Sequence, residues 1–223
     1  MAKTKGTKTK EKILKEAIKM YNEHGSQNTT GRHIAAQLGI SHGNLDYYFK
    51  NKEAILLAIY KKMRKEMSTS YLLKDEYGNS FEHFHRLLLH LEQFQYTFRF
   101  FNLDVLEINR SNPEVSKMLH ETLEMRKLQV ENFFKEFIDE GFIEKSESFS
   151  FERLQHTIRI IITFWLSQKE VLAGYKYSEV GEMTHHIWEL LIPYMTKTGS
   201  KEYKRLIDQF GFTGANEPKS SEY

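Results

Sequence analysis

The sequence predicts an all-α protein, on three observations. Apolar residues recur at the three- and four-residue spacing of a helix face along most of the 223 residues. No segment shows the alternation of apolar and polar residues that is typical of a half-buried strand. The chain has only three prolines and twelve glycines, so few of its segments suit the tight turns that sheets require.

Four helices are expected in the first 72 residues. The first has an apolar face from Ile13 to Tyr21 and should end at Gly25, because glycine can adopt the left-handed conformation beyond a helix end. Two short helices follow at 31–38 and 42–49. The fourth begins near residue 51 and continues to about residue 71, where the spacing of its apolar residues is lost.

The rest of the sequence, after residue 72, predicts a series of longer helices separated by polar or glycine-containing turns. The expected helices are 81–101, 103–109, 113–140, 151–173, 180–196 and 201–210. A polar segment at 74–80 suggests the domain boundary. We therefore expect an N-terminal domain at 1–56, a linking helix from about 51 to 72, a helical domain at 75–212 and a tail at 213–223.

Composition excludes several classes of protein. The chain has no cysteine, so it has no disulfide scaffold, thiolate zinc site or cysteine nucleophile. Its first ten residues are polar and basic, so no secretory signal is expected. The most apolar run, Ile160 to Leu166, is far shorter than the roughly 18 residues that cross a membrane. A cytoplasmic protein without a membrane partner is expected.

Residues 29–55 have the pattern of a helix-turn-helix motif. Two N-caps are expected at Thr30 and Ser41, and Gly39 provides the turn between the short helices. In such a motif the second helix enters the major groove of DNA by its N-terminal end. The apolar positions that pack the two helices together are Ile34, Ala35, Leu38, Leu45 and Phe49.

The charge distribution also favours a polyanionic partner for this part of the chain. Residues 1–65 have fourteen Lys and Arg against five Asp and Glu, whereas the remainder has eighteen against twenty-five. A basic segment attached to an acidic one indicates that the basic segment meets the polyanion.

Several side chains of the motif suit contacts with DNA. Asn44 can form two hydrogen bonds with adenine, and Gly43 leaves room for the backbone to approach. The tyrosines and the lysine have the length and polarity to bind phosphates, as does the start of the first short helix. The predicted DNA-binding residues are Thr30, Arg32, His42, Gly43, Asn44, Tyr47, Tyr48 and Lys52.

The segment from Thr9 to Ile59 resembles the DNA-binding domain of the TetR family of bacterial transcriptional regulators. One position departs from the family's pattern, since Asp46 stands where an aromatic residue is usual. Its carboxylate repels phosphate, so it is expected either to accept a hydrogen bond from a cytosine amino group or to orient a neighbour such as His42. The residues that match the pattern are Thr30, Ile34, Ala35, Leu38, Gly39, Ile40, Ser41, Gly43, Leu45, Tyr48, Phe49, Lys52, Glu53 and Ile55.

The resemblance implies a sequence-specific regulator, a repressor that a small, largely apolar ligand releases from a palindromic operator. It also implies a homodimer formed by the helices at 151–173 and 180–196. Dimerisation follows from the DNA argument too, because one small motif contacts few bases and a two-fold dimer contacts two half-sites.

The densest apolar cluster, at 94–106, has two interpretations. It is either plain helical core or the wall of a ligand cavity in which a few polar groups orient the ligand. Arg159 lies in an apolar run and can pair with an acidic ligand, or instead with Asp104 or Glu107. The candidate ligand-binding residues are Phe98, Phe101, Asn102, Asp104 and Arg159.

Other classes of function find little support. His120 and Glu124 share a helix face, but two ligands do not complete a metal site, so no metal or other cofactor is expected. The chain has no phosphate-binding glycine loop, His-Glu-x-x-His or Gly-x-Ser-x-Gly motif, so an enzyme is not expected. The alternative is a helical protein-interaction module without DNA binding, which only Asp46 favours.

Overall fold

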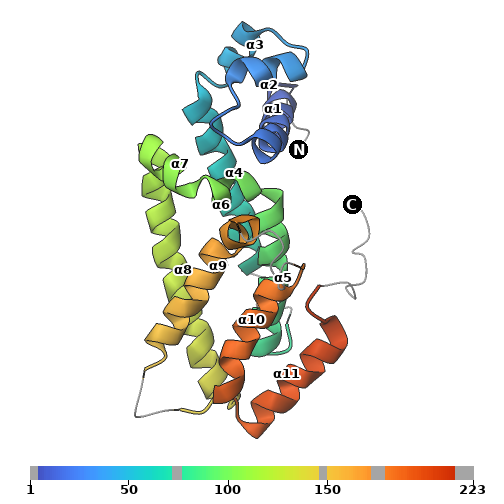
Figure 1. The fold of residues 1–223 in the computed structure, drawn as a ribbon, viewed down its shortest axis with the longest axis vertical. Helices are drawn as coiled ribbons and strands as arrows, with labels where there is room; N and C mark the ends of the chain where they lie inside the picture. The colour runs from blue at the N-terminus through green and yellow to red at the C-terminus, as the bar shows by residue number, and fades with distance from the viewer. Residues whose placement is uncertain (1–4, 72–76, 146–149, 172–178, 214–223) are drawn as a thin grey trace. The chain divides into compact units, whose positions relative to one another are not determined.

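The computed structural model describes residues 5–71, 77–145, 150–171 and 179–213, and within these ranges it is built from helices (Figure 1). One isolated bridge between Ile143 and Met195 is the only β-type pairing in the described ranges. The all-α fold class is confirmed. None of the helices in these ranges is both long and apolar enough to cross a membrane.

The helices are labelled in Figure 1. In chain order they are α1 (Lys5–His24), α2 (Gly31–Gln37), α3 (His42–Tyr48), α4 (Lys52–Tyr71), α5 (Ser80–Thr97), α6 (Arg99–Leu103), α7 (Val105–Ser111), α8 (Pro113–Asp139), α9 (Glu152–Val171), α10 (Glu182–Leu191), the 3-10 helix η2 (Ile192–Tyr194) and α11 (Lys197–Phe210).

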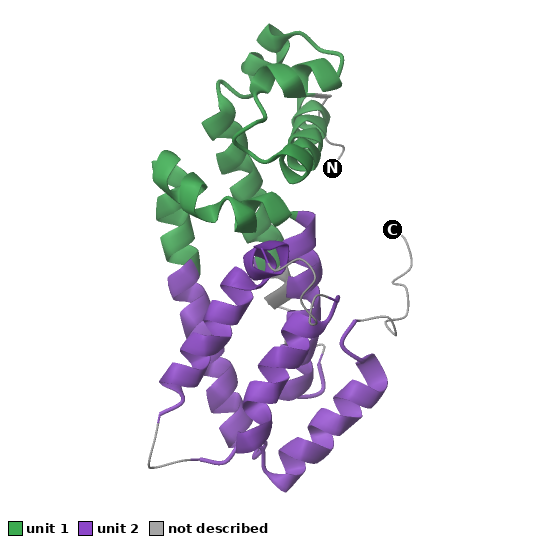
Figure 2. Cartoon of the chain, in the orientation of Figure 1, with its two compact units in different colours: residues 1–67, 98–122 green, residues 68–97, 123–223 purple. Residues whose placement is uncertain are grey.

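The chain divides into two compact units that interleave along the sequence (Figure 2). Unit 1 comprises residues 1–67 and 98–122, and unit 2 comprises residues 68–97 and 123–223. Residues 98–122 therefore belong with the N-terminal helices. The sequence instead predicts a single boundary between functional domains at 1–56 and 75–212. That division into functional domains stays a prediction.

The first helices of unit 1 start and stop at side chains that the sequence identifies. Thr30 and His33 form a reciprocal capping box at the start of α2, and the Ser41 hydroxyl accepts a hydrogen bond from the backbone N–H of Asn44 at 3.2 Å. Gly25 ends α1 with φ of +80°, a conformation that glycine adopts without strain. The predicted caps and this stop are confirmed.

Polar contacts join the end of α1 to α6 within unit 1. The Asp104 carboxylate accepts hydrogen bonds from the backbone N–H of Ser26 at 2.8 Å and from its hydroxyl at 2.6 Å. The Arg99 guanidinium donates to the carbonyl oxygen of Asn22 at 2.8 and 3.0 Å, and the Asn22 side chain accepts from the N–H of Phe100 at 3.0 Å. Helices separated by more than 70 residues in sequence are thus fixed together.

Unit 2 packs around an aromatic core supplied by α5, α8 and α10. The Phe81 ring lies 4.8 Å from Phe137 and 4.9 Å from Trp188, and all three side chains are fully buried. Edge-to-face arrangements of this kind are favourable for aromatic rings. His85 connects the core to the end of α11, since Nε2 faces the carbonyl oxygen of Gly211 at 2.9 Å and Nδ1 accepts from the Trp188 indole at 3.0 Å.

Two predicted helices are shorter in the structure. The helix expected at 81–101 ends at Thr97, because Phe98 leaves the helical conformation (φ −118°, ψ 37°) before α6 begins. The helix expected at 180–196 ends at Leu191, because Pro193 has no N–H to continue the hydrogen-bond ladder, and a 3-10 turn follows.

The last helix begins earlier than the predicted 201–210. The Thr196 side chain accepts from the N–H of Gly199 and starts α11 at Lys197. Residues 214–223 of the tail expected at 213–223, and the last two residues of the helix expected at 151–173, lie outside the described residues.

Candidate nucleic-acid interface

α2 and α3 form the helix-turn-helix that the sequence predicts. The turn between them is closed by the N–H of Ile40, which donates to the carbonyl oxygen of Ala35 at 3.0 Å, and Gly39 has φ of +65°. Ile34, Ala35 and Leu45 are almost fully buried, and they pack the two short helices against the rest of unit 1. The motif is therefore held by a small apolar core.

The opposite face of α3 is exposed and polar. Tyr47 is 83% exposed, which is unusual for so large a ring, and it contacts the Tyr48 ring edge-on at 5.1 Å. A side chain at Gly43 would meet nothing within 4 Å, so the backbone there is open to a close partner. Asn44 is also exposed. Of the predicted α3 residues, His42, Gly43, Asn44 and Tyr47 are thus exposed, whereas Tyr48 is half-buried.

His42 and Asp46 face each other along α3. Nδ1 of His42 lies 3.2 Å from Oδ2 of Asp46, and the two are one helical turn apart. The imidazole also lies beside α2, since a methyl group on Gly31 would be 3.4 Å from Nε2. The sequence predicts Asp46 as a possible partner of His42. It does not predict the nearness of Gly31 to His42, because that depends on how α2 and α3 pack.

The predicted contacts outside α3 differ in their surroundings. Thr30 and Arg32 are exposed at the start of α2, where the Thr30 hydroxyl already accepts a hydrogen bond from His33. Lys52 is half-buried, and burial lowers the pKa of its ammonium group, whereas the carboxylates of Glu53, Asp104 and Glu107 act in the opposite direction. Lys52 therefore lies near acidic groups as well as at the start of α4.

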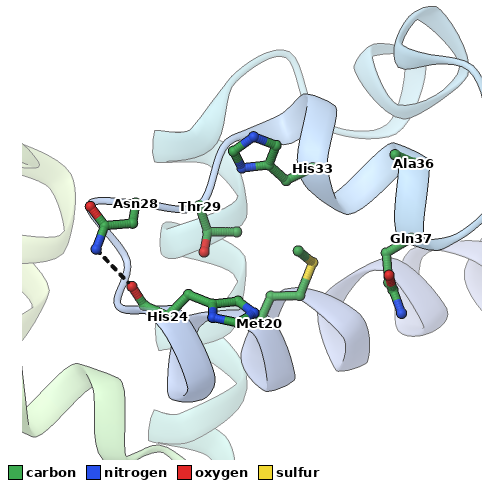
Figure 3. Close-up of a pocket in the computed structure, with 7 residues that line it drawn as sticks. All are labelled: Met20, His24, Asn28, Thr29, His33, Ala36 and Gln37. Carbon is green, nitrogen blue, oxygen red and sulfur yellow. Dashed lines mark hydrogen bonds between the residues drawn. The ribbon is translucent and has the colours of Figure 1, made fainter.

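An open hollow of about 690 Å³ lies in the seam between α1 and α2 (Figure 3). Met20 and His24 line it from α1, and His33, Ala36 and Gln37 line it from α2, while Asn28 and Thr29 come from the connecting segment. The Asn28 side chain donates to the carbonyl oxygen of His24 at 2.9 Å. This hollow depends on the packing of two helices, so it has no local signal in the sequence. In the described ranges, no group of three acidic or histidine side chains is suited to bind a metal ion.

The five candidate ligand-binding residues are divided between the units. Phe98 and Phe101 are buried in unit 1, Asn102 is half-buried, and Asp104 is the partner of Ser26. Arg159 belongs to α9 in unit 2, where its guanidinium lies 3.2 Å from Nδ1 of His156. The structure therefore groups four of the five residues on and beside α6.

Two family models match the sequence and together cover most of it. The model described as "Bacterial regulatory proteins, tetR family" matches residues 13–59, which contain the helix-turn-helix. The model described as "Bacterial transcriptional repressor" matches residues 62–203. A helix-turn-helix transcriptional regulator of Bacillus subtilis, YerO, is 43% identical over 49 residues, which are 22% of this chain and 17% of that protein.

Solved structures share the fold over almost the whole chain. A TetR-family transcriptional regulator from Marinobacter aquaeolei superposes with a TM-score of 0.79 at 23% identity, covering 90% of this chain and 97% of the other. A putative regulator from Saccharomonospora viridis in complex with choline gives a TM-score of 0.70 at 17% identity, with coverages of 85% and 99%. A gamma-butyrolactone receptor gives 0.70 at 17% identity, with coverages of 92% and 97%.

Proposed function

The chain belongs to the tetR family of bacterial regulatory proteins, which are DNA-binding transcriptional regulators rather than enzymes, and from this premise we propose that it is a homodimeric repressor. The dimer binds a palindromic operator, and a small, largely apolar ligand releases it. The exposed polar face of α3 is the observation that carries the proposal, because its opposite face is fixed in the core of the motif.

The proposed DNA contacts are of two kinds. Asn44 and His42 contact base edges in the major groove, while Tyr47 and Tyr48 bind phosphates beside them. Gly43 allows the backbone of α3 to approach the groove, which its open surroundings support. Phosphate contacts by Thr30, Arg32 and Lys52 complete the set on α2 and α4.

Dimerisation is proposed through α9 and α10. Ile160 and Phe164 are one turn apart on α9, and each is 46% exposed. Val171 extends the same face at helical spacing and is more exposed still. Apolar side chains exposed along one helix favour burial against a second copy of that helix. Ile192, beyond the end of α10, is a further exposed apolar residue in this part of unit 2.

The effector is proposed to act on the segment around α6, with Phe98 and Phe101 as apolar contacts and Asn102 as an orienting group. Arg159 belongs to α9 in unit 2 and is proposed separately as a partner for an acidic ligand. Asp104 already accepts two hydrogen bonds from Ser26, so a ligand donor that binds Asp104 competes with Ser26. That competition loosens the end of α1, and by linkage a ligand that prefers the loosened form lowers DNA affinity.

Two related folds suggest the first ligands to test. One was solved with choline, a quaternary ammonium compound, and another is a receptor for gamma-butyrolactones. A panel of both chemistries, with medium-chain fatty acids as an acidic apolar class, covers the groups that Asp104 and Arg159 can bind. Release of the operator by any member, measured by fluorescence anisotropy, identifies the effector class.

Selection of bound sequences from a random duplex pool, at two salt concentrations, tests the proposal. We expect a palindrome whose binding weakens as salt rises, because phosphate contacts release counterions. A folded dimer that enriches no sequence, with or without the ligand panel, would instead support a helical protein-interaction module.

A further inference from the structure

The histidine and the aspartate of α3 form a side-chain pair on an exposed helix face. Their facing atoms, Nδ1 of His42 and Oδ2 of Asp46, are 3.2 Å apart, and the two side chains are 45% and 43% exposed. Residues four apart lie on the same face of a helix, so α3 itself brings the two groups together. The pair stays accessible to a partner.

The position of the pair on α3 places it at the edge of the proposed DNA-binding face. Leu45 is buried and Tyr47 is 83% exposed, so Tyr47 marks the outward face. Around the helix axis, Asp46 is displaced from Tyr47 by about 100° and His42 by about 140°. On that side the imidazole of His42 lies beside Gly31, the first residue of α2. The imidazole of the pair therefore lies where α3 meets the start of α2.

The charge of Asp46 requires an explanation at such a position. A lone carboxylate on a surface that meets DNA is repelled by the phosphates. Nδ1 of His42 lies within hydrogen-bond distance of this carboxylate, so an Nδ1–H donated to Asp46 leaves Nε2 as the ring atom that can meet another group. The geometry thus favours the imidazole, and not the carboxylate, as the group that meets DNA.

We propose that Asp46 acts on DNA through His42, and that the two residues are one recognition unit. Asp46 is a positioning residue that fixes the imidazole between α3 and Gly31. Nε2 of His42 hydrogen-bonds a base edge in the major groove. This inference rests on the proposed DNA-binding function of α3.

A double-mutant cycle in the full-length protein tests whether His42 and Asp46 act together. The proteins are the wild type, His42→Gln, Asp46→Asn and the double variant. Each is titrated against the duplex obtained by selection and against a scrambled duplex of the same composition, at two salt concentrations. The control pair is His24→Gln and Glu23→Gln, because these side chains are also exposed and lie 3.8 Å apart in unit 1, but on α1.

If His42 and Asp46 act together, their effects on operator affinity are not additive. We expect His42→Gln to weaken operator binding about tenfold, and Asp46→Asn to weaken it about five- to tenfold because the imidazole is no longer fixed. Asp46→Asn should also strengthen binding to the scrambled duplex about two- to threefold, since a negative charge is lost. The double variant should bind the operator no more weakly than His42→Gln, and the control pair should bind as the wild type does.

Four results would overturn the inference. Additive losses in the double variant would show that the two residues act independently. Relaxed selection at one C·G pair in Asp46→Asn, but not in His42→Gln, would show direct contact by the carboxylate. A wild type that enriches no sequence would overturn the DNA-binding proposal as well, whereas operator binding that depends on Asn44 but not on His42 or Asp46 would leave that proposal standing.

Discussion

Asp104 accepts two hydrogen bonds from Ser26, a residue 78 positions earlier in the chain, and Ser26 is fully buried. Hydrogen bonds to an ionised acceptor are stronger than those between neutral groups. The contact joins the segment after α1 to the end of α6, so it stabilises unit 1 in addition to its proposed part in ligand response.

Removal of the Ser26 hydroxyl should destabilise the protein. Ser26→Ala deletes the donor at 2.6 Å and leaves the carboxylate with the backbone N–H alone. We expect the free energy of unfolding to fall by about 1.5–3 kcal/mol, measured by urea denaturation. Ser200→Ala is the control, since that exposed hydroxyl donates only within its own helix, and it should change stability by less than about 0.5 kcal/mol.

Asn44 should contribute to specificity without contributing to stability. Asn44→Ala is expected to weaken operator binding by about 1–3 kcal/mol and to relax selection at the adenine it contacts. Affinity for scrambled DNA and the melting temperature should be nearly unchanged, because the side chain is exposed. Equal losses for both duplexes would assign Asn44 to the phosphate backbone instead.

Lys52 should contribute equally to the affinity for every DNA sequence. Lys52→Ala is expected to weaken binding to every duplex about equally and to reduce the slope of log affinity against log salt by about 0.9. The alternative is that Lys52 interacts with the nearby carboxylates of Glu53, Asp104 and Glu107 and not with DNA. DNA affinity that does not change, together with a lower melting temperature, would mean that Lys52 serves unit 1 rather than DNA.

His85 should make stability depend on pH. Burial lowers the pKa of its imidazole from 6.5 to about 4, and the Trp188 indole donates to the neutral ring. The unfolded chain therefore binds a proton below pH 6.5 that the folded protein does not. Stability should fall as pH decreases from about 6.5 to 4, by up to about 3 kcal/mol, and change little from this cause below 4.

Glu92 acts with the opposite sign and has to be separated from His85. Burial raises the pKa of its carboxyl group, so the folded state retains a proton that the unfolded state loses as pH rises through the unfolded pKa. The comparison of wild type with His85→Gln isolates the imidazole, because Gln can still accept from Trp188 but does not titrate. A pH profile that is the same in both proteins would contradict the assignment to His85.

Gly199 should be intolerant of a side chain. A methyl group there would overlap the carbonyl oxygen of Phe142, and a backbone atom cannot move aside as a flexible side chain does. Gly199→Ala should lower stability by about 3 kcal/mol or more, or prevent folding. Gly6→Ala is the matched helical control, since nothing lies within 4 Å of its added methyl group, and it should be neutral or slightly stabilising.

The helix-turn-helix could be predicted from sequence because its signals are local. Thr30, Ser41 and Gly39 determine helix starts and turns within a few residues of themselves, and the structure confirms the caps. The positions of Phe98 and Pro193 show the limit of helical periodicity. The spacing of apolar residues continues through both positions. The helices end because the backbone of Phe98 is not helical and because Pro193 has no N–H.

Other features depend on contacts between distant parts of the chain. Asp104 could be named from the sequence as a polar residue in an apolar cluster, but its partner Ser26 lies in another helix connection. Gly31 and the hollow between α1 and α2 likewise require the packed helices. The candidate ligand residues remain a prediction for the same reason, since Arg159 and the other four come from different units.

The interleaving of the two units has a consequence for synthesis on the ribosome. Asn22 and Ser26 form hydrogen bonds with residues 99–104, so α1 to α4 emerge well before these contacts of unit 1 can form. Domains generally fold as they are made, from the N-terminus onward. A nascent chain that stops after α4 therefore lacks the hydrogen bonds that residues 99–104 supply to the end of α1 in the folded protein.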